Sequence, residues 1–194
     1  MNKSQEHISK FLSKILRHDP SIIGITLDSQ GWADVTELMI GMQKQGKFVE
    51  LSDLEIVVSQ DSKAKNGNPG RYSFNDDKTK IRANQGHNKK LKHVKLDYTP
   101  LSSREVPNWL YHGTNSRFVE AIKKEGLVKM NRQHVHLSDE IETANEVGDR
   151  RLKQDTETHI FKISTIEAMN DGVVFYKSKN GVYLADAIPA WLLR

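Results

Sequence analysis

The strongest constraint on the fold is a change of sequence pattern near the middle of the chain. Residues 97–107 (DYTPLSSREVP) hold two prolines and no apolar periodicity, which is typical of a boundary between folded parts. The sequence before them reads as helices and a hairpin, and the sequence after them as alternating short strands and helices. The 194 residues are enough for two small cores. We predict an α+β protein with lobes at 1–96 and 108–194 and a linker at 97–107.

The first lobe opens with an amphipathic helix that ends in two basic side chains. Its apolar residues recur at helical spacing: Ile8, Phe11, Leu12, Ile15 and Leu16. His18 continues this stripe, and Asp19-Pro20 ends the helix because proline has no N–H to donate. Arg17 and His18 are therefore expected at the helix C-terminus, partly in the core face. They either complement the helix dipole or face an anion.

The rest of the first lobe predicts two more helices and a hairpin. Capping-box pairs predict the helix starts: Asp34 with Glu37, and Ser52 with Glu55. Gly46 is expected to end the first of these helices, and the segments 71–74 (RYSF) and 80–84 (KIRAN) flank a turn at NDDKT. Three helices and a basic hairpin are typical of a winged-helix module, a common nucleic-acid binder.

Positive charge gathers in one stretch of the chain. Residues 78–96 contain seven Lys or Arg and no Asp or Glu, in a chain with net charge +4 and a pI near 9.1. Such a stretch is either a soluble face or a site for a polyanion, and nucleic acid fits the absence of acids. Arg71 and Arg82 on the two hairpin strands are placed to converge on one phosphate, since the arginine fork makes two-point contacts.

The second lobe offers two polar motifs. In YHGT (111–114), Gly113 would let a ligand approach the backbone, and residues 114–116 can cap a helix whose N-terminus attracts anions. An ordinary strand-to-helix turn is the alternative. In NRQHVHLS (131–138), strand alternation puts Arg132, His134 and His136 on one face, which is a binding row or a solvated face. Asn180-Gly181 predicts a type I′ hairpin.

Composition excludes several classes of function. The chain has no cysteine, so it has no disulfides, thiolate catalysis or cysteine metal sites, and its eight histidines show no familiar zinc spacing. We expect no bound metal. No apolar run approaches a membrane span, and the N-terminus lacks the apolar core of a signal peptide, so we expect a cytoplasmic protein. The sequence does not indicate the oligomeric state, and a monomer is the default expectation.

Six short motifs together resemble a known family. They are LRH (16–18), GRYSF (70–74), RANQGH (82–87), YHGT, RQHVHLS (132–138) and NGVYLADAIP (180–189). In this order, across nearly the whole chain, they resemble the NAD-dependent RNA 2′-phosphotransferases of the KptA type, also called tRNA 2′-phosphotransferases, which act in tRNA splicing and processing. The resemblance implies a winged-helix RNA lobe and a lobe with the ADP-ribosyltransferase fold. It also implies that NAD is consumed as co-substrate while RNA loses an internal 2′-phosphate.

The resemblance also implies roles for individual residues. The catalytic set would be Arg17, His18, Arg71 and Arg132, with His18 either orienting the phosphate or acting as acid or base. The NAD-binding set would be His112, Gly113, Thr114, His136, Ser138 and Arg150, although the role of Arg150 is not assigned. We place RNA contacts on Arg82, Gln85, His87, Lys89 and Lys90. The sequence departs from the family pattern in a longer loop before Arg71 (KAKNGNPG) and in the acidic Asp149 of VGDRR.

Two rival functions remain open from the sequence. One is an ADP-ribosyltransferase that caps phosphorylated nucleic-acid ends and stops after one step, and the other is an RNA-binding module without catalysis. Related transferases that modify protein side chains usually carry a glutamate on a late strand, and NGVYLADAIP has none. A phosphate monoester is largely a dianion at pH 7 and needs no general base, so this absence favours a phosphate nucleophile.

Overall fold

The computed structural model describes residues 2–61, 69–150 and 156–194, and the chain divides into two compact units at residues 1–97 and 98–194. Each unit mixes helices with antiparallel strands, so the predicted α+β class is confirmed. No helix in the described part of the chain is long and apolar enough to cross a membrane. The predicted loop KAKNGNPG lies outside the described residues except for its last two positions.

The predicted linker belongs to the second unit. The backbone N–H of Leu101 donates to the carbonyl of Phe175 at 2.8 Å, Pro100 bridges to Tyr176, and Val106 is buried in the core. This segment has no periodicity because it packs through single apolar residues in irregular backbone. Two prolines and the lack of apolar periodicity suggested a linker, but the units divide after residue 97, so residues 98–107 are part of the second unit.

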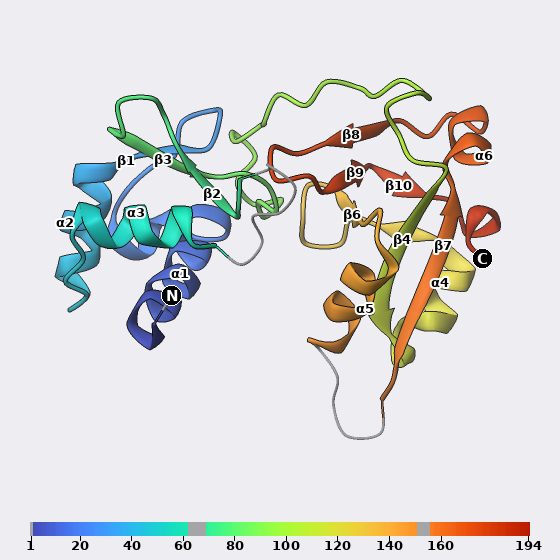
Figure 1. The fold of residues 1–194 in the computed structure, drawn as a ribbon, viewed down its shortest axis with the longest axis horizontal. Helices are drawn as coiled ribbons and strands as arrows, with labels where there is room; N and C mark the ends of the chain where they lie inside the picture. The colour runs from blue at the N-terminus through green and yellow to red at the C-terminus, as the bar shows by residue number, and fades with distance from the viewer. Residues whose placement is uncertain (1, 62–68, 151–155) are drawn as a thin grey trace. The chain divides into compact units, whose positions relative to one another are not determined.

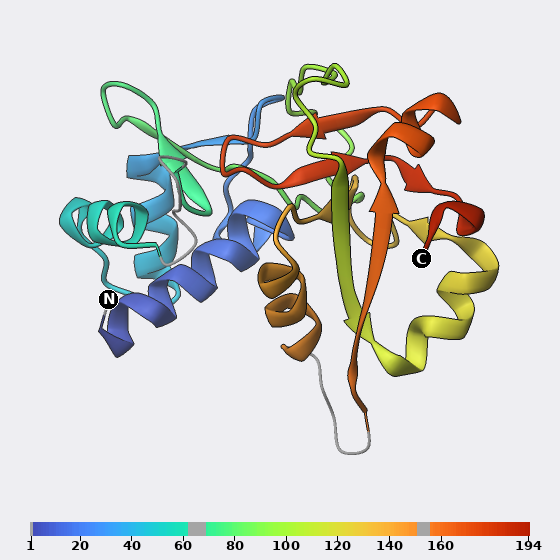
Figure 2. The same cartoon turned by 45° about the vertical axis from the view of Figure 1, so that its right-hand side comes forward.

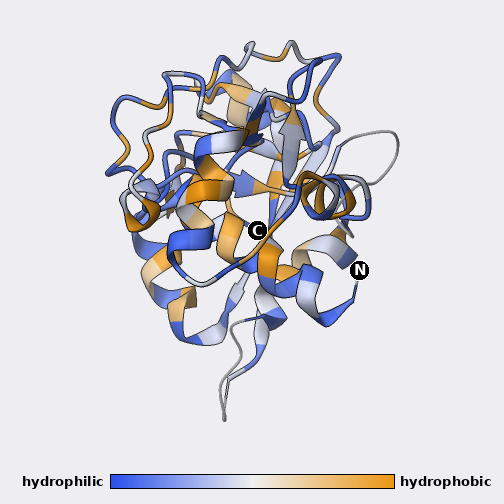
Figure 3. Cartoon of the chain, turned by 90° about the vertical axis from the view of Figure 1, so that its left-hand side faces the viewer, coloured by the Kyte–Doolittle hydropathy of each residue, from blue (hydrophilic) through white to orange (hydrophobic). Residues whose placement is uncertain are grey.

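The first unit consists of three helices and a three-stranded antiparallel sheet (Figure 1). The helices are α1 (Lys3–Arg17), α2 (Val35–Lys44) and α3 (Leu51–Ser59), with a 3₁₀ turn at Pro20–Ile23. The strands are β1 (Trp32–Asp34), β2 (Tyr72–Phe74) and β3 (Lys80–Ala83), in the order β1-β3-β2. Leu12, Ile15 and Leu16 of α1 are fully buried in the core of this unit. In Figure 3 the helices facing the viewer show hydrophobic and hydrophilic segments around each turn, as expected when one helix face is buried.

Local signals in the first unit were largely correct. Asp34 caps α2 by accepting from the Glu37 N–H at 2.9 Å, and the hairpin joins β2 to β3. The start of α3 was predicted two residues too late, because Glu50 rather than Ser52 is the N-cap. The Glu50 N–H donates to the Asp53 carboxylate at 3.1 Å. The sequence offered Ser52 with Glu55 as a second pair at the spacing of a capping box, and the prediction chose that pair.

The second unit is built on a long antiparallel pair, β4 (Trp109–Asn115) with β7 (Thr158–Ser164), with α5 (Ile141–Asp149) lying along β4 (Figures 1 and 2). A second sheet has the order β6-β9-β8, from β6 (Val135–Leu137), β8 (Phe175–Lys177) and β9 (Tyr183–Ala185). The remaining elements are α4 (Val119–Glu125), α6 (Thr165–Asn170), the pair β5 (Leu127–Val128) with β10 (Ala187–Ile188), and 3₁₀ turns at Ser116–Phe118 and Ala190–Leu192.

The hairpin predicted at Asn180-Gly181 forms, but with another turn. The Gly181 N–H donates to Ser178 O at 2.9 Å, so Gly181 is the last residue of the turn rather than its centre. Gly181 has φ of 81°, whereas Asn180 is not among the described residues with positive φ, and a type I′ turn needs positive φ at both central residues. The predicted hairpin is confirmed by the antiparallel pairing of β8 with β9, but the predicted turn type was wrong.

Candidate active-site residues of the two units

The end of α1 separates its two basic residues. Arg17 is the last residue of the helix and is 9% exposed, whereas His18 is the C-cap and is exposed. The backbone of His18 leaves helical geometry, with φ of −123° and ψ of −51°, ahead of Asp19-Pro20. Arg17 in the core face is as predicted, but His18 does not continue the buried stripe because the helix has already ended.

The buried ring of Tyr72 brings two arginines of the predicted set together. The guanidinium carbons of Arg17 and Arg71 each lie 6.0 Å from the centroid of this ring. The Tyr72 hydroxyl donates to Ser9 O at 2.6 Å, which ties β2 to α1. Burial raises the pKa of Tyr72 against the opposing charges of Arg17 and Arg71, so the phenol stays neutral beside both cations. The structure thus places these two cations on one rigid aromatic support.

Arg71 is held by a buried carboxylate. Its Nε donates to both oxygens of Asp61, at 3.2 and 3.0 Å, and its backbone N–H donates to the same side chain at 2.5 Å. Burial alone would lower the pKa of Arg71, but the hydrogen bond and charge of Asp61 outweigh it and the pKa is raised. Because Asp61 contacts Nε, the ion pair fixes the stem of the side chain and leaves the two terminal nitrogens outside these contacts.

The RANQGH segment packs against Arg17, and its own arginine contacts Trp32. A Cβ on Gly86 would lie 3.6 Å from the Arg17 guanidinium carbon, and the Asn88 N–H donates to Arg17 O at 2.7 Å. Arg82 stacks on Trp32, with its guanidinium carbon 4.4 Å from the ring centroid, and donates to Gln30 O. The two hairpin arginines therefore have different partners, although they share a face of the sheet.

His87 is a structural residue rather than a surface one. It was predicted to contact RNA, but it is 1% exposed, and its buried Nε2 has no hydrogen-bond partner among the described residues. Burial, with the charges of Arg17, Arg82 and His18, lowers the pKa of His87 to about 4. The ring is therefore neutral at pH 7. The prediction that this side chain contacts RNA was wrong, because the ring is buried.

The depressed pKa of His87 predicts a loss of stability in mild acid. The unfolded chain takes up a proton near pH 6.5 that the folded chain resists until about pH 4. The unfolding free energy should therefore be full above pH 6.5 and fall towards pH 4, by at most about 3 kcal/mol. Denaturant unfolding between pH 7 and 4 measures this, with His87→Gln as the comparison. Equal pH slopes for the two proteins would show that His87 does not resist protonation.

The basic stretch contains fewer available cations than its sequence suggested. Lys78 pairs with Glu55 at 2.6 Å and Lys80 with Asp28 at 3.8 Å, both from distant parts of the chain. Arg82 contacts Trp32 and Gln30, as described above. The four lysines that remain are exposed, and none forms an ion pair among the described residues: Lys89, Lys90, Lys92 and Lys95. Buried Leu91 and Val94 anchor this segment to the core of the first unit, so the lysines project from a fixed backbone.

In the second unit, a backbone bridge places His112 against β6. Tyr111 and Ser138 exchange backbone hydrogen bonds of 2.8 and 2.9 Å, which aligns the end of β6 with β4. His112 Nδ1 lies 3.1 Å from the carbonyl of His136, so this nitrogen carries the proton and donates. Burial lowers the pKa of His112, and nearby Arg132 adds to the effect against the hydrogen bond to His136. The neutral ring presents Nε2 as an acceptor.

Gly113 serves helix packing rather than ligand approach. A Cβ at this position would lie 2.6 Å from the carbonyl carbon of Ala144 and closer still to its oxygen. Helix α5 therefore packs directly on the β4 backbone at the YHGT motif, which corrects the expected role of this glycine. The predicted cap is Asn115, whose side chain accepts from the Arg117 N–H at 3.1 Å.

The predicted row of Arg132, His134 and His136 on one strand face is wrong. Strand β6 begins at residue 135, and Arg132 lies in a turn in which its N–H donates to Lys129 O at 2.8 Å. His134 contacts Tyr98 and Tyr176 edge-on, with centroids 5.6 and 6.1 Å apart. In the part of the chain that the structure describes, no three His, Asp or Glu side chains gather in a way that would hold a metal ion.

The other predicted NAD contacts occupy different places in the second unit. Thr114 lies in β4 opposite His159, and Ser138 forms the backbone bridge to Tyr111. Arg150 follows α5, is exposed, and lies 3.9 Å from Glu146. His112, His136 and Ser138 are thus brought together, and Arg150 belongs to the far end of the helix that covers Gly113.

Sequence reasoning missed two residues that organise the first unit, Asp61 and Tyr72. Tyr72 lies inside GRYSF, and alternation in the strand places it on the side opposite Arg71, so a core role could have been inferred. Asp61 has no such signal, because its partner is ten residues away along the chain.

Comparison with known proteins gives one consistent result. The family profile described as RNA 2′-phosphotransferase, Tpt1 / KptA family, matches residues 3–187. A protein of Flavobacterium johnsoniae named probable RNA 2′-phosphotransferase is 44% identical, covering 94% of this chain and 91% of that protein. Proteins with the same name from Fusobacterium nucleatum (40%, covering 96% of each chain) and Trichormus variabilis (44%, covering 95% and 93%) are also similar.

Proposed function

The chain belongs to the RNA 2′-phosphotransferase family, and from this premise we propose that it removes an internal 2′-phosphate from RNA by transferring it to NAD. The observation that carries the proposal is the support of Arg17 and Arg71 by one buried tyrosine, with exposed His18 next to Arg17. Two guanidinium groups on a rigid support form a site for a phosphate dianion, since each makes paired, charge-assisted hydrogen bonds.

The proposed reaction has two steps. The RNA 2′-phosphate attacks C1″ of the nicotinamide ribose, and the C1″–N bond breaks to release nicotinamide. The ribose O2″ then attacks the same phosphorus, and the RNA 2′-oxygen leaves and takes up a proton. The products are RNA with a 2′-hydroxyl and ADP-ribose 1″,2″-cyclic phosphate. The second step is intramolecular, so positioning supplies much of the acceleration.

The first unit is assigned to RNA and its phosphate. The three helices and the sheet order β1-β3-β2 support a winged-helix assignment for this unit. Arg17 and Arg71 would neutralise charge on the phosphorus, and His18 would orient the phosphate or transfer the proton. The exposed lysines at 89, 90, 92 and 95, together with Gln85, would contact the RNA backbone.

The second unit is assigned to NAD. The sheets β4-β7 and β6-β9-β8, linked by the Tyr111–Ser138 bridge, support an ADP-ribosyltransferase-like assignment. Neutral His112 would accept a hydrogen bond from a ribose hydroxyl through Nε2, because Nδ1 donates to His136 O. Arg132, an exposed cation beside His112, would contact the 2′-phosphate of the RNA. The late strand β9 holds Tyr183, Leu184 and Ala185, all buried, which agrees with a substrate that needs no general base.

The decisive experiment incubates the protein with NAD and a short RNA that bears one internal 2′-phosphate. Loss of the phosphate together with equimolar nicotinamide and cyclic phosphate product supports the proposal. A stable ADP-ribosyl adduct on RNA would indicate a capping transferase instead. RNA binding without any change to either substrate would indicate a module without catalysis, and either result would overturn the proposal.

We expect RNA affinity to fall steeply with salt while NAD affinity changes little. Each phosphate contact on a single strand contributes about 0.7 to the slope of log K against log salt, so four lysines give a slope up to about 3. Titrations of RNA and of NAD between 50 and 200 mM salt, roughly the range over which counterion release is measured, provide the comparison. Equal salt slopes for RNA and NAD would show that the lysines of residues 89–95 do not contact RNA.

His112→Ala should abolish nicotinamide release, because the variant loses the acceptor held at β4. The matched control is His159→Ala, which removes an imidazole from the paired strand β7 at the position opposite Thr114. We expect the control to release nicotinamide at close to the normal rate. Normal release by His112→Ala would show that the ring only packs between β4 and β6.

A further inference from the structure

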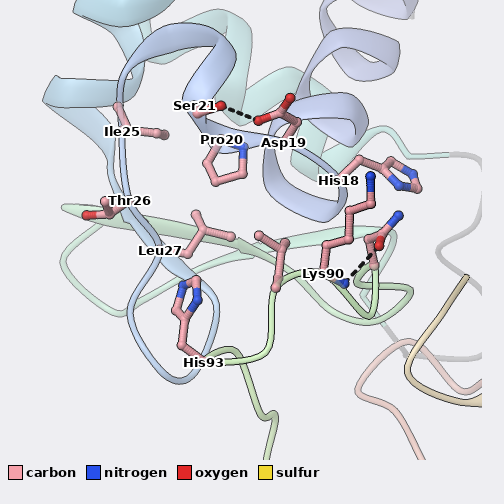
Figure 4. Close-up of a pocket in the computed structure, with 11 residues that line it drawn as sticks. His18, Asp19, Pro20, Ser21, Ile25, Thr26, Leu27, Lys90 and His93 are labelled. Atoms are coloured by element: carbon pink, nitrogen blue, oxygen red, sulfur yellow. Dashed lines mark hydrogen bonds between the residues drawn. The ribbon is translucent and has the colours of Figure 1, made fainter.

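The first unit contains a hollow beside the proposed phosphate site. The turn after α1, the segment 25–27 and the segment 88–93 enclose it (Figure 4). Its lining includes apolar Pro20, Ile25 and Leu27. His18, the exposed residue of the proposed phosphate site, is also part of the lining, so the hollow adjoins that site.

The polar side chains of the lining include one carboxylate, and the others are basic or uncharged. Figure 4 shows Lys90 extending towards the side on which His18 lies, whereas His93 lies beside Leu27. Lys90 and His93 are exposed, and neither forms an ion pair among the described residues. The single carboxylate of the lining, Asp19, accepts a hydrogen bond from the Ser21 hydroxyl.

An apolar floor with an imidazole and an ammonium at its rim matches the chemistry of a nucleoside. A base has an apolar face that packs on aliphatic side chains or stacks on a ring, and its backbone phosphate requires a cation at the edge. An uncharged peptide or a neutral lipid chain would leave the cations of residues 89–95 without a partner. RNA satisfies both the apolar floor and the charge.

We infer that this hollow binds the nucleoside adjacent to the 2′-phosphorylated nucleotide, with His93 against its base and Lys90 on its phosphate. The inference rests on the proposed function, since it places the neighbouring nucleoside next to the His18 end of the phosphate site. It adds a contact to the neighbouring nucleoside that strengthens substrate binding. A 2′-phosphorylated mononucleoside would react without filling the hollow.

The test compares two substrates across four variants. The substrates are a 2′-phosphorylated mononucleoside and a trinucleotide with a central 2′-phosphate. His93→Ala and Lys90→Ala remove the two rim groups, and His7→Ala and Lys10→Ala remove an exposed histidine and lysine on α1 as matched controls. We expect both rim variants to raise KM for the trinucleotide roughly fivefold or more, while kcat, and KM for the mononucleoside, stay near wild type. Both controls should behave as wild type.

Three results would overturn the inference. An unchanged trinucleotide KM in both rim variants, with phosphate removal intact, rejects the hollow and keeps the proposed function. An equal rise of KM for both substrates shows that the rim groups act on the 2′-phosphate itself. If the wild-type protein transfers no phosphate, the proposed function fails. The affinity for the unmodified trinucleotide then tests whether the hollow binds a nucleoside. Equal affinity of His93→Ala and His7→Ala in that measurement rejects it.

Discussion

Replacing Arg17 with lysine should lower the rate of 2′-phosphate removal by about ten- to a hundredfold, which corresponds to roughly 1.5–3 kcal/mol of transition-state stabilisation. Lysine keeps the charge but cannot form the paired contacts of a guanidinium, whose central carbon lies 6.0 Å from the centroid of the Tyr72 ring in Arg17. If Arg17 only complemented the dipole of α1, lysine would replace it with little effect, since that interaction depends on charge. Turnover of short 2′-phosphorylated RNA measures the difference.

The last turn of α1 provides the control for this experiment. Lys14 lies in the same turn as Arg17 but is exposed, so Lys14→Ala removes a dipole-complementing charge without touching the phosphate site. We expect Lys14→Ala to turn over as wild type does. The melting temperature of Arg17→Lys should stay within about 8 °C of wild type, as for a loss near 1 kcal/mol. Wild-type turnover by Arg17→Lys would reduce Arg17 to an ordinary helix-end cation.

Local chemistry predicted where Arg17 sits, but not what surrounds it. The end of α1 could be predicted because Asp19-Pro20 acts on the adjacent backbone. The support from Tyr72 and the packing of Gly86 and His87 come from residues more than fifty positions away, and a single sequence contains no periodic signal for such contacts. The same limit explains why Arg82 was expected on a phosphate and is found on Trp32.

The errors in the second unit have local physical causes. The row from Arg132 to His136 assumed a strand throughout, yet Met130 adopts φ of 35° and the chain turns before β6 begins. The charge count at residues 78–96 was correct, but Glu55 and Asp28 neutralise its first two lysines across the fold. Composition measures charge along the chain, whereas binding depends on charge that remains unpaired after folding.

Gly113→Ala should destabilise the second unit by about 3 kcal/mol or more, because the new Cβ would overlap backbone rather than side chain. The carbonyl of Ala144 blocks this position, and a backbone group within α5 cannot move without shifting the helix. Gly148→Ala is the matched comparison, since its Cβ would lie 2.5 Å from Thr158 Cγ2, which is a side-chain atom rather than a backbone atom. We expect the second change to lower the melting temperature less than the first.

The two explanations of the YHGT glycine differ in which property fails first. If Gly113 exists for the packing of α5, the alanine variant should melt early, and any protein that remains folded at low temperature should bind NAD with reduced affinity because α5 has shifted. If the glycine instead lets NAD approach the backbone, the variant should melt like wild type and fail only in NAD binding and nicotinamide release. Melting curves recorded with and without NAD distinguish these outcomes. The position of the Ala144 carbonyl favours early melting without NAD, because the clash is present before any ligand binds.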